Sequence, residues 1–285
     1  MGISADQIRE LHKYEVRILL ILERLMRRYR WVPLDIIKRT IGLSESEVSY
    51  RLGRLMDGGF VRFDTVPYEG YSLIFQGYDA LALLSLSKKG TIQALGCMIG
   101  EGKESVIYEG LGLSPVALKF HHVGQRSFQS ARVTRDYIPE EGNCPWLLAS
   151  RLSAEREFEA LRTLHPDVSV PLPVDINRHT IVMEFIPGAT LNRCLLESPK
   201  DILFEIIENV RLSYKAGIIH SDLSEFNVMH DGSLIYIIDW PQWIGRDHPN
   251  AEELLMRDLA NITRYFSRRY RVDLATVEAY EMVTG

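Results

Sequence analysis

One stretch constrains this chain more than any other: "HSDLSEFNVMHDGSLIYIIDW", which runs from His220 to Trp240. It places Asp222 and Asn227 on a short polar loop and then ends an apolar run at Asp239. Taken singly, each could be a turn former or a helix cap. Taken together, they are oxygen groups of the kind that bind Mg²⁺ or orient an attacking hydroxyl. The stretch therefore predicts a loop and a buried strand that carry a reactive site.

The spacing within this stretch narrows the chemistry. Asp222 and Asn227 stand in the frame His-x-Asp-x-x-x-x-Asn, which is the spacing of the protein-kinase catalytic loop. Asp239 follows twelve residues after Asn227, at the end of the strand "LIYII". We expect Asp222 to act as the catalytic aspartate, while Asn227 and Asp239 hold a metal ion.

A glycine-rich segment precedes this stretch at residues 96–105, "GCMIGEGKES". Gly100 and Gly102 let the backbone approach an anion closely, and Lys103 and Ser105 lie beside them. The segment departs from the Walker A pattern, because no glycine stands five residues before Gly102 and no Ser or Thr follows Lys103. A strand-loop-strand context instead predicts a kinase-type lid over ATP. A hairpin without a ligand is the alternative.

A lysine within an apolar strand supplies a further indication. Lys119 lies in "SPVALKF", where a buried ammonium needs anionic partners, although a lysine that reaches solvent is the alternative. The later helix "SRLSAEREFEALRTL" offers Glu157 as the partner, with Glu155 as the second choice. The strand "HTIVMEF" then predicts a hinge whose backbone groups bond an adenine edge, at Met183, Glu184 and Ile186.

The first ninety residues have a different pattern. The segment from Ser4 to Trp31 predicts two helices, and the next contains a short helix, a turn at Gly42, and a helix capped by Ser44 with Glu47 completing a capping box. "VRFDTVPYEGYSLIFQG" predicts a two-stranded wing, and "GYDALALLSLSKKG" predicts another helix. The order resembles a winged helix-turn-helix domain.

Charge and composition bear on partners and location. Residues 1–90 hold 14 Lys and Arg against 11 Asp and Glu, although the whole chain has a net charge of −5. We expect Arg51, Arg54, Lys38 and Arg39 to contact nucleic-acid phosphates, with a packing or protein-docking role as the alternative. No apolar run approaches the roughly 18 residues of a membrane span, and the three cysteines lack zinc or dithiol spacing. We expect a cytoplasmic protein.

Several motifs together carry a resemblance to a known family: "GYDALAL", "GEGKES", "ALKFHHVGQRSF", "RLSAEREF", "HSDLSEFN" and "IDWPQ". The chain resembles the RIO family of atypical protein kinases, in the archaeal and eukaryotic Rio two branch with an N-terminal winged helix. Its departures from ordinary kinases fit: Ser221 replaces the usual Arg, and Asp-Trp-Pro replaces Asp-Phe-Gly. The short tail after Asp239 argues against a general peptide kinase.

The resemblance implies roles for particular residues. Gly100, Gly102, Lys103 and Ser105 would frame the ATP phosphates, Lys119 and Glu157 would pair, and the cofactors would be ATP with Mg²⁺ or Mn²⁺. Asp239 would be both metal ligand and transient phosphate acceptor in an ATPase cycle. Asp258 would brace the catalytic loop. The candidate autophosphorylation sites are Ser127, Ser130 and Thr134.

The predicted fold is α+β: a winged helix-turn-helix domain at residues 1–90, then a truncated bilobal kinase-like domain at 91–285. Within the latter we expect an N-lobe at about 91–183, a hinge at 183–187 and a C-lobe at 188–285. The expected function is ATP-dependent serine/threonine phosphorylation or ATP hydrolysis, with the precursor of the small ribosomal subunit and its rRNA as partners. The alternatives are a small-molecule phosphotransferase of the aminoglycoside or choline kinase type, and an ATP-switched ribosome-binding protein with little turnover.

Overall fold

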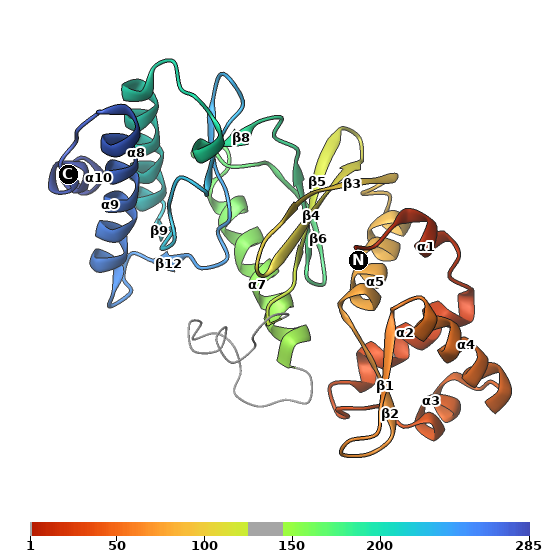
Figure 1. Ribbon diagram of the computed structural model, residues 1–285. Coiled ribbons are helices and arrows are strands. Elements are labelled where there is room, and N and C mark those ends of the chain that lie inside the picture. The colour runs from red at the N-terminus through yellow and green to blue at the C-terminus, as the bar shows by residue number, and fades with distance from the viewer. Residues whose placement is uncertain (1, 125–144) are drawn as a thin grey trace. The chain divides into compact units, whose positions relative to one another are not determined.

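The computed structural model describes residues 2–124 and 145–285, so Ser127, Ser130 and Thr134 lie outside the described residues. The chain forms two compact units (Figure 1). The first comprises Met1–Leu152 with Asp175–Val182, and the second comprises Ser153–Val174 with Met183–Gly285. Among the described residues, no helix is both long enough and apolar enough to cross a bilayer.

The first unit begins with the predicted winged helix. Its helices are α1 (Ala5–Arg9), α2 (Lys13–Leu25), α3 (Leu34–Ile41), α4 (Glu45–Asp57) and α5 (Phe75–Lys89). The wing pairs β1 (Val61–Asp64) with β2 (Gly70–Leu73) in antiparallel register. Gly42 ends α3 at φ 71°, which a glycine adopts without strain. The predicted order of helices and wing is confirmed.

Packing within the winged helix gives two arginines of α4 acidic partners inside the protein. Arg51 and Arg54 both contact the carboxylate of Glu15, at 3.3 and 3.0 Å, and only 1% of that side chain is exposed. The Glu47 carboxylate accepts from Arg51 Nε at 2.8 Å, while Ser44 Oγ accepts from the backbone N–H of Glu47. A buried carboxylate needs cationic partners, so these arginines stabilise α2 against α4.

A five-stranded sheet completes the first unit, in the order β3-β4-β5-β7-β6. The strands are β3 (Ala94–Glu101), β4 (Ser105–Leu111), β5 (Pro115–His121), β6 (Pro173–Asn177) and β7 (Thr180–Glu184). The core of the winged helix continues into this sheet: buried Leu22 and Leu81 belong to the same apolar cluster as Leu118 and Phe120. Apolar burial therefore holds winged helix and sheet together as one compact unit.

The second unit is mainly helical. Its helices are α7 (Pro145–Leu164) from Ser153 onward, α8 (Pro199–Lys215), α9 (Ala251–Tyr270) and α10 (Thr276–Thr284), and a short 3₁₀ helix spans Leu191–Arg193. Five short strands are β8 (Ala189–Thr190), β9 (Ile218–Ile219), β10 (Val228–His230), β11 (Ile235–Ile237) and β12 (Ile244–Gly245). β10 pairs with β8 and β11, and β12 pairs with β9. The stretch from His220 to Trp240 occupies the loop and hairpin after β9.

Candidate active site

The loop that carries Asp222 is fixed from beneath by one buried carboxylate. Asp258, 1% exposed on α9, accepts the backbone N–H of Ser221 at 2.7 Å and that of Leu223 at 3.0 Å. Arg257 donates to the carbonyl of Ser221, and Asn261 Nδ2 donates to the carbonyl of Leu223 at 3.0 Å. The loop backbone is thus held on both sides of Asp222, which is itself exposed.

The hairpin β10–β11 brings the predicted metal ligands, Asn227 and Asp239, to its open end. Val228 pairs with Ile237, so Asn227 precedes one strand where Asp239 follows the other. The N–H of Ile238 donates to the carbonyl of Asn227 at 2.9 Å, and Asn227 Nδ2 donates to the carbonyl of Asp222 at 2.9 Å. The structure therefore places Asp222, Asn227 and Asp239 on adjoining backbone segments, with the Asn227 side-chain oxygen still able to accept or coordinate.

Two residues of this region adopt left-handed backbone angles. Ser221 has φ 61° and Asp239 has φ 68°, which are uncommon outside glycine and asparagine. The hydrogen bonds of Ser221 to Asp258 and Gln242 hold it there. Strain of this kind is concentrated at functional sites.

Burial changes the pKa of Asp258, the residue that holds the loop. Desolvation raises the pKa of Asp258 to about 6, although His220, the two backbone N–H donors and Arg257 each act to lower it. His220 in turn hydrogen-bonds the carbonyl of Ile238 at 3.0 Å through Nε2, which ties the loop to the end of β11.

Arg156 and Trp243 form a contact that no sequence motif indicates. Arg156 Nε donates to the carbonyl of Pro241 at 3.2 Å and its guanidinium also donates to the carbonyl of Trp243. Trp243 Nε1 returns a bond to the carbonyl of Arg156 at 2.9 Å, and the guanidinium lies 4.9 Å from the indole centroid. These bonds fix α7 to the segment that follows Asp239, so they set the place of Glu157 on that helix.

The structure separates the two candidate glutamates of α7. Glu157 is 1% exposed, whereas Glu155 faces solvent. Because a buried carboxylate requires a cation or hydrogen bonds, Glu157 is the better candidate for pairing with a buried lysine. Lys119 belongs to the other unit, where it lies on β5 opposite Ile107 of β4 and is 4% exposed.

The predicted hinge starts in the last residues of β7. The N–H of Glu184 donates to the carbonyl of Leu172 at 2.9 Å, and its carboxylate accepts from the N–H of Leu172 at 3.2 Å. Since the Glu184 N–H is used in this way, an adenine edge would have to be read by other backbone groups of the segment. Met183 and Ile186 are both buried, at 8% and 7% exposure.

The glycine segment forms the predicted strand-loop-strand hairpin. Gly100 pairs with Ile107, and β3 departs from regular register between Met98 and Gly100. Gly102 N–H donates to the carbonyl of Ser105 at 2.8 Å, which closes the tip around exposed Lys103. A Cβ on Gly100 would lie no closer than 3.7 Å to its neighbours, and one on Gly102 no closer than 3.4 Å. Internal packing does not require these glycines, which fits a backbone that must approach something outside the protein.

Comparisons with known proteins agree with this arrangement. A family model described as "RIO domain" matches residues 104–279, and one described as "Rio2, N-terminal" matches residues 8–89. The chain belongs to the RIO family, in its Rio2 branch. It is 44% identical to the RIO-type serine/threonine-protein kinase Rio2 of Methanocaldococcus jannaschii, over 87% of this chain and 94% of that protein.

Two eukaryotic relatives extend the comparison. The serine/threonine-protein kinase RIO2 of Caenorhabditis elegans is 33% identical over 94% of this chain, which spans 52% of that protein. The crystal structure of the Rio2 kinase from Chaetomium thermophilum in an ADP/Mg²⁺-phosphoaspartate complex matches with a TM-score of 0.83 and 28% identity. That match covers 99% of this chain and 89% of the Chaetomium chain.

Membership in the RIO family decides several expectations. The fold class, a winged helix followed by a RIO kinase domain, is confirmed. The chain is an enzyme of the serine/threonine-protein kinase class, as predicted. The expected cofactors agree with the ADP and Mg²⁺ of the Chaetomium complex. A small-molecule phosphotransferase of the aminoglycoside type is thereby disfavoured.

Proposed function

We propose that this chain is an ATP- and Mg²⁺-dependent serine/threonine kinase and ATPase that autophosphorylates and acts in maturing the small ribosomal subunit in the cytoplasm. The observation that carries the catalytic part is the braced loop and hairpin, which present Asp222, Asn227 and Asp239 on adjoining segments. The proposed domains remain a winged helix at 1–90 and a kinase domain at 91–285, with the hinge at about 183–187.

Asp222, Asn227 and Asp239 have different proposed roles in the reaction. Asn227 and Asp239 offer an amide and a carboxylate oxygen, a donor set that fits Mg²⁺. The ion would neutralise charge on the ATP phosphates. Asp222, held in place through its backbone, would accept the proton of an attacking hydroxyl.

Asp239 has a second proposed role, which the phosphoaspartate in the Chaetomium complex supports. Its carboxylate oxygen would attack the γ-phosphorus of ATP, forming an acyl phosphate while the bond to the β-phosphate oxygen breaks and ADP leaves. Water would then attack the acyl phosphate, releasing inorganic phosphate and restoring the carboxylate. With Asp222 as base, a serine or threonine hydroxyl would instead take the phosphoryl group.

The remaining proposed site residues bind ATP. Gly100, Gly102, Lys103 and Ser105 would surround its phosphates through backbone N–H and side-chain donors. Lys119 would pair with Glu157 and would contact the phosphates as well. Met183, Glu184 and Ile186 would border the adenine.

Two variants test the catalytic proposal. Asp222→Asn removes the proton acceptor, and Asp239→Asn removes both the ligand and the phosphate acceptor, so each should lower turnover by about 10²-fold or more. The matched control is Asp247→Asn, an exposed aspartate in the same unit. The measurement is incubation with γ-labelled ATP and Mg²⁺, with and without small-subunit precursor, followed by acid and hydroxylamine treatment of the labelled protein.

The outcomes separate the two activities. Acid-stable label indicates serine or threonine phosphorylation, while hydroxylamine-labile label that disappears in Asp239→Asn indicates an aspartyl phosphate. Wild-type turnover in Asp222→Asn would refute its catalytic role. ATP binding with neither label nor phosphate release would favour an ATP-switched binding protein.

A further inference from the structure

A row of arginines on α2 is not used by the proposed catalytic site. Arg17, Ile21, Arg24 and Arg28 follow one another at intervals of four, three and four residues, the spacing that keeps side chains on one helix face. Arg28 lies in the turn that continues α2, since Tyr29 N–H donates to the carbonyl of Leu25 at 3.0 Å. We call the three arginines and Ile21 the arginine stripe.

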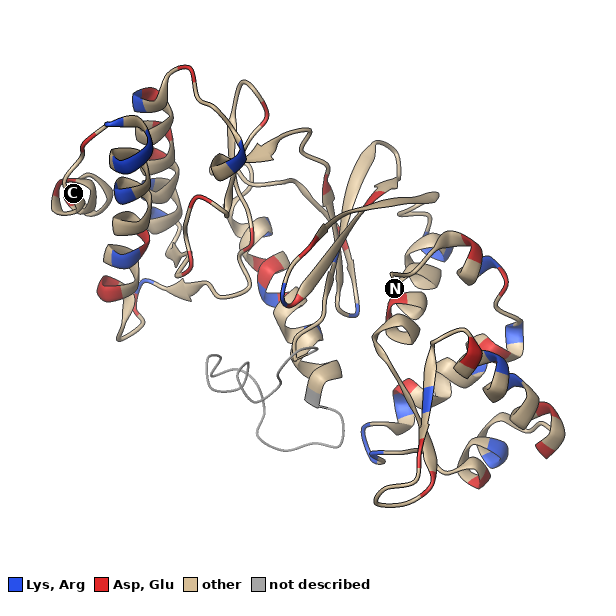
Figure 2. Ribbon diagram, viewed as in Figure 1, with Lys and Arg blue, Asp and Glu red and all other residues tan. Residues whose placement is uncertain are grey.

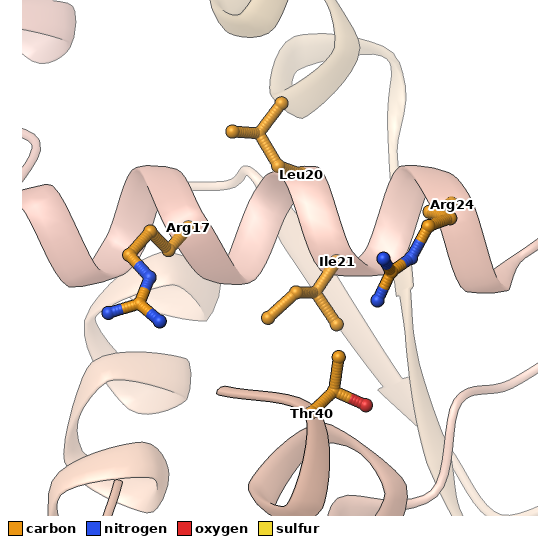
Figure 3. Close-up of a pocket in the computed structure, with 5 residues that line it drawn as sticks. All are labelled: Arg17, Leu20, Ile21, Arg24 and Thr40. Atoms are coloured by element: carbon orange, nitrogen blue, oxygen red, sulfur yellow. The ribbon is translucent and has the colours of Figure 1, made fainter. Parts of the chain in front are cut away.

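A pocket opens along this stripe. Figure 3 shows Arg17, Ile21 and Arg24 projecting from the same side of α2, with Thr40 of α3 opposite them. The pocket has a volume of about 390 Å³ and includes Leu20, which is 43% exposed. Its lining therefore combines guanidinium groups with an apolar surface between them.

The arginines of the stripe differ from the cations of α3 and α4. Arg51 and Arg54 are bound to buried Glu15, Lys38 pairs with Glu45, and Arg39 pairs with Asp35. Arg17, Arg24 and Arg28 make no ion pair with any residue in the described parts of the chain, and all three are exposed. Figure 2 marks the turn after α2 as basic. The α3–α4 face, where a winged helix would be expected to contact phosphates, has its charge neutralised internally.

One arginine of the stripe is already oriented. Arg17 donates to the carbonyl of Ile41 at 3.1 Å and lies 6.0 Å from the ring centroid of Tyr14. Its guanidinium is therefore held at the margin of the pocket, which lowers the entropic cost of binding an anion there.

We propose that the arginine stripe binds the phosphate backbone of RNA, which places the nucleic-acid contact of the winged helix on α2 instead of α4. From Arg17 to Arg28 the helix rises about 16 Å, so the stripe presents regularly spaced cations that match a polyanion better than a single carboxylate. Guanidinium forks suit phosphate oxygens, and Leu20 and Ile21 offer apolar contact to sugars or bases. This inference deepens the proposed role in ribosomal-subunit maturation and rests on it for the choice of RNA.

The test variant is Arg24→Glu/Arg28→Glu. It reverses the charge of two side chains that make no hydrogen bond or ion pair to the rest of the described chain. Arg17 stays unchanged because it bonds to Ile41. The control, Arg264→Glu/Arg268→Glu on α9, changes two exposed arginines and shifts the net charge equally, from −5 to −9. Binding of a labelled RNA stem-loop to each full-length protein is measured across a salt series, with polyglutamate as a second ligand.

We expect the stripe variant to bind RNA at least roughly tenfold more weakly than the control, with the slope of log K against log salt reduced by about 1.5 to 2. Equal binding by both variants, or loss of polyglutamate binding alone, would overturn the proposal; the latter would indicate an acidic protein partner. Labelling by γ-labelled ATP is measured in parallel. A stripe variant that loses RNA but keeps labelling supports the inference, whereas absent labelling in wild type with intact RNA binding would refute only the proposed catalysis.

Discussion

Two buried aspartates, one in each compact unit, have opposite electrostatic behaviour. Asp79 on α5 accepts from His122 Nε2 at 2.9 Å and from His179 Nε2 at 2.7 Å. Burial by itself would raise the pKa of Asp79, but the two imidazoles outweigh it and the pKa lies below its ordinary value. Burial raises the pKa of Asp258 to about 6 despite two backbone N–H donors.

The difference shows what each carboxylate is built to do. His122 Nδ1 and His179 Nδ1 have no hydrogen-bond partner in the described parts of the chain, so the Nε2–H of each imidazole is the group that donates to Asp79. The network joins α5, the segment after β5 and the turn before β7. Asp258 instead holds a loop whose backbone must stay in left-handed geometry, and its charge is maintained at a larger electrostatic cost.

The largest expected effect is the loss of the Asp79 network. Asp79→Ala leaves two buried imidazole N–H groups without their acceptor, so the free energy of unfolding should fall by about 2–6 kcal/mol. Urea denaturation measures it, with the exposed Asp6→Ala as the control. A loss no larger than that of the control would show that the network does not stabilise the unit.

Acid titration should show that His179 and Asp258 contribute to the pH dependence of stability with opposite signs. Burial lowers the pKa of His179 from 6.5 to about 4, so the unfolded chain takes up a proton first and stability falls as pH falls from 6.5 to 4. The pKa of Asp258 is raised from 3.8 to about 6, so the folded chain takes up a proton first and stability rises over the same descent. The two contributions oppose each other in the wild type.

Asp258→Asn removes the contribution of the Asp258 carboxyl to the pH dependence of stability. As the pH is lowered from 6 to 4, the free energy of unfolding of Asp258→Asn should fall by about 3 kcal/mol more than that of the wild type. Urea denaturation at several pH values measures the difference. Parallel curves for the two proteins would mean that Asp258 does not titrate as its burial requires.

A smaller effect of the same substitution concerns catalysis at neutral pH. The amide of Asp258→Asn would accept only one of the two N–H groups that the carboxylate binds, so kcat for ATP turnover should fall about tenfold with KM for ATP unchanged. Asn261→Ala, which removes a neutral bond to Leu223, is the matched comparison and should cost less. An effect on KM alone would assign Asp258 to nucleotide binding instead of loop positioning.

Local spacing was enough to predict much of the fold and of the catalytic loop. The turn at Gly42, the wing and the buried strand that ends before Asp239 each involve residues close in sequence, whose geometry follows from turn and strand rules. The interior position of Glu157, preferred over Glu155, follows from helical periodicity. The ion pairs of Arg51 and Arg54 with buried Glu15 could not be predicted in this way, because Glu15 is more than thirty residues away from both.

What the sequence determined by itself, then, is the set of groups that one loop, one turn or one helix face holds together. Tertiary structure alone decided which ionisable residues are neutralised inside the protein. Asp79 meets His122 and His179 across 43 and 100 residues, and Arg156 meets Trp243 across 87. The reason is physical: a charge is stabilised or desolvated by whatever the fold packs around it, and periodicity along the chain carries no information about neighbours that distant.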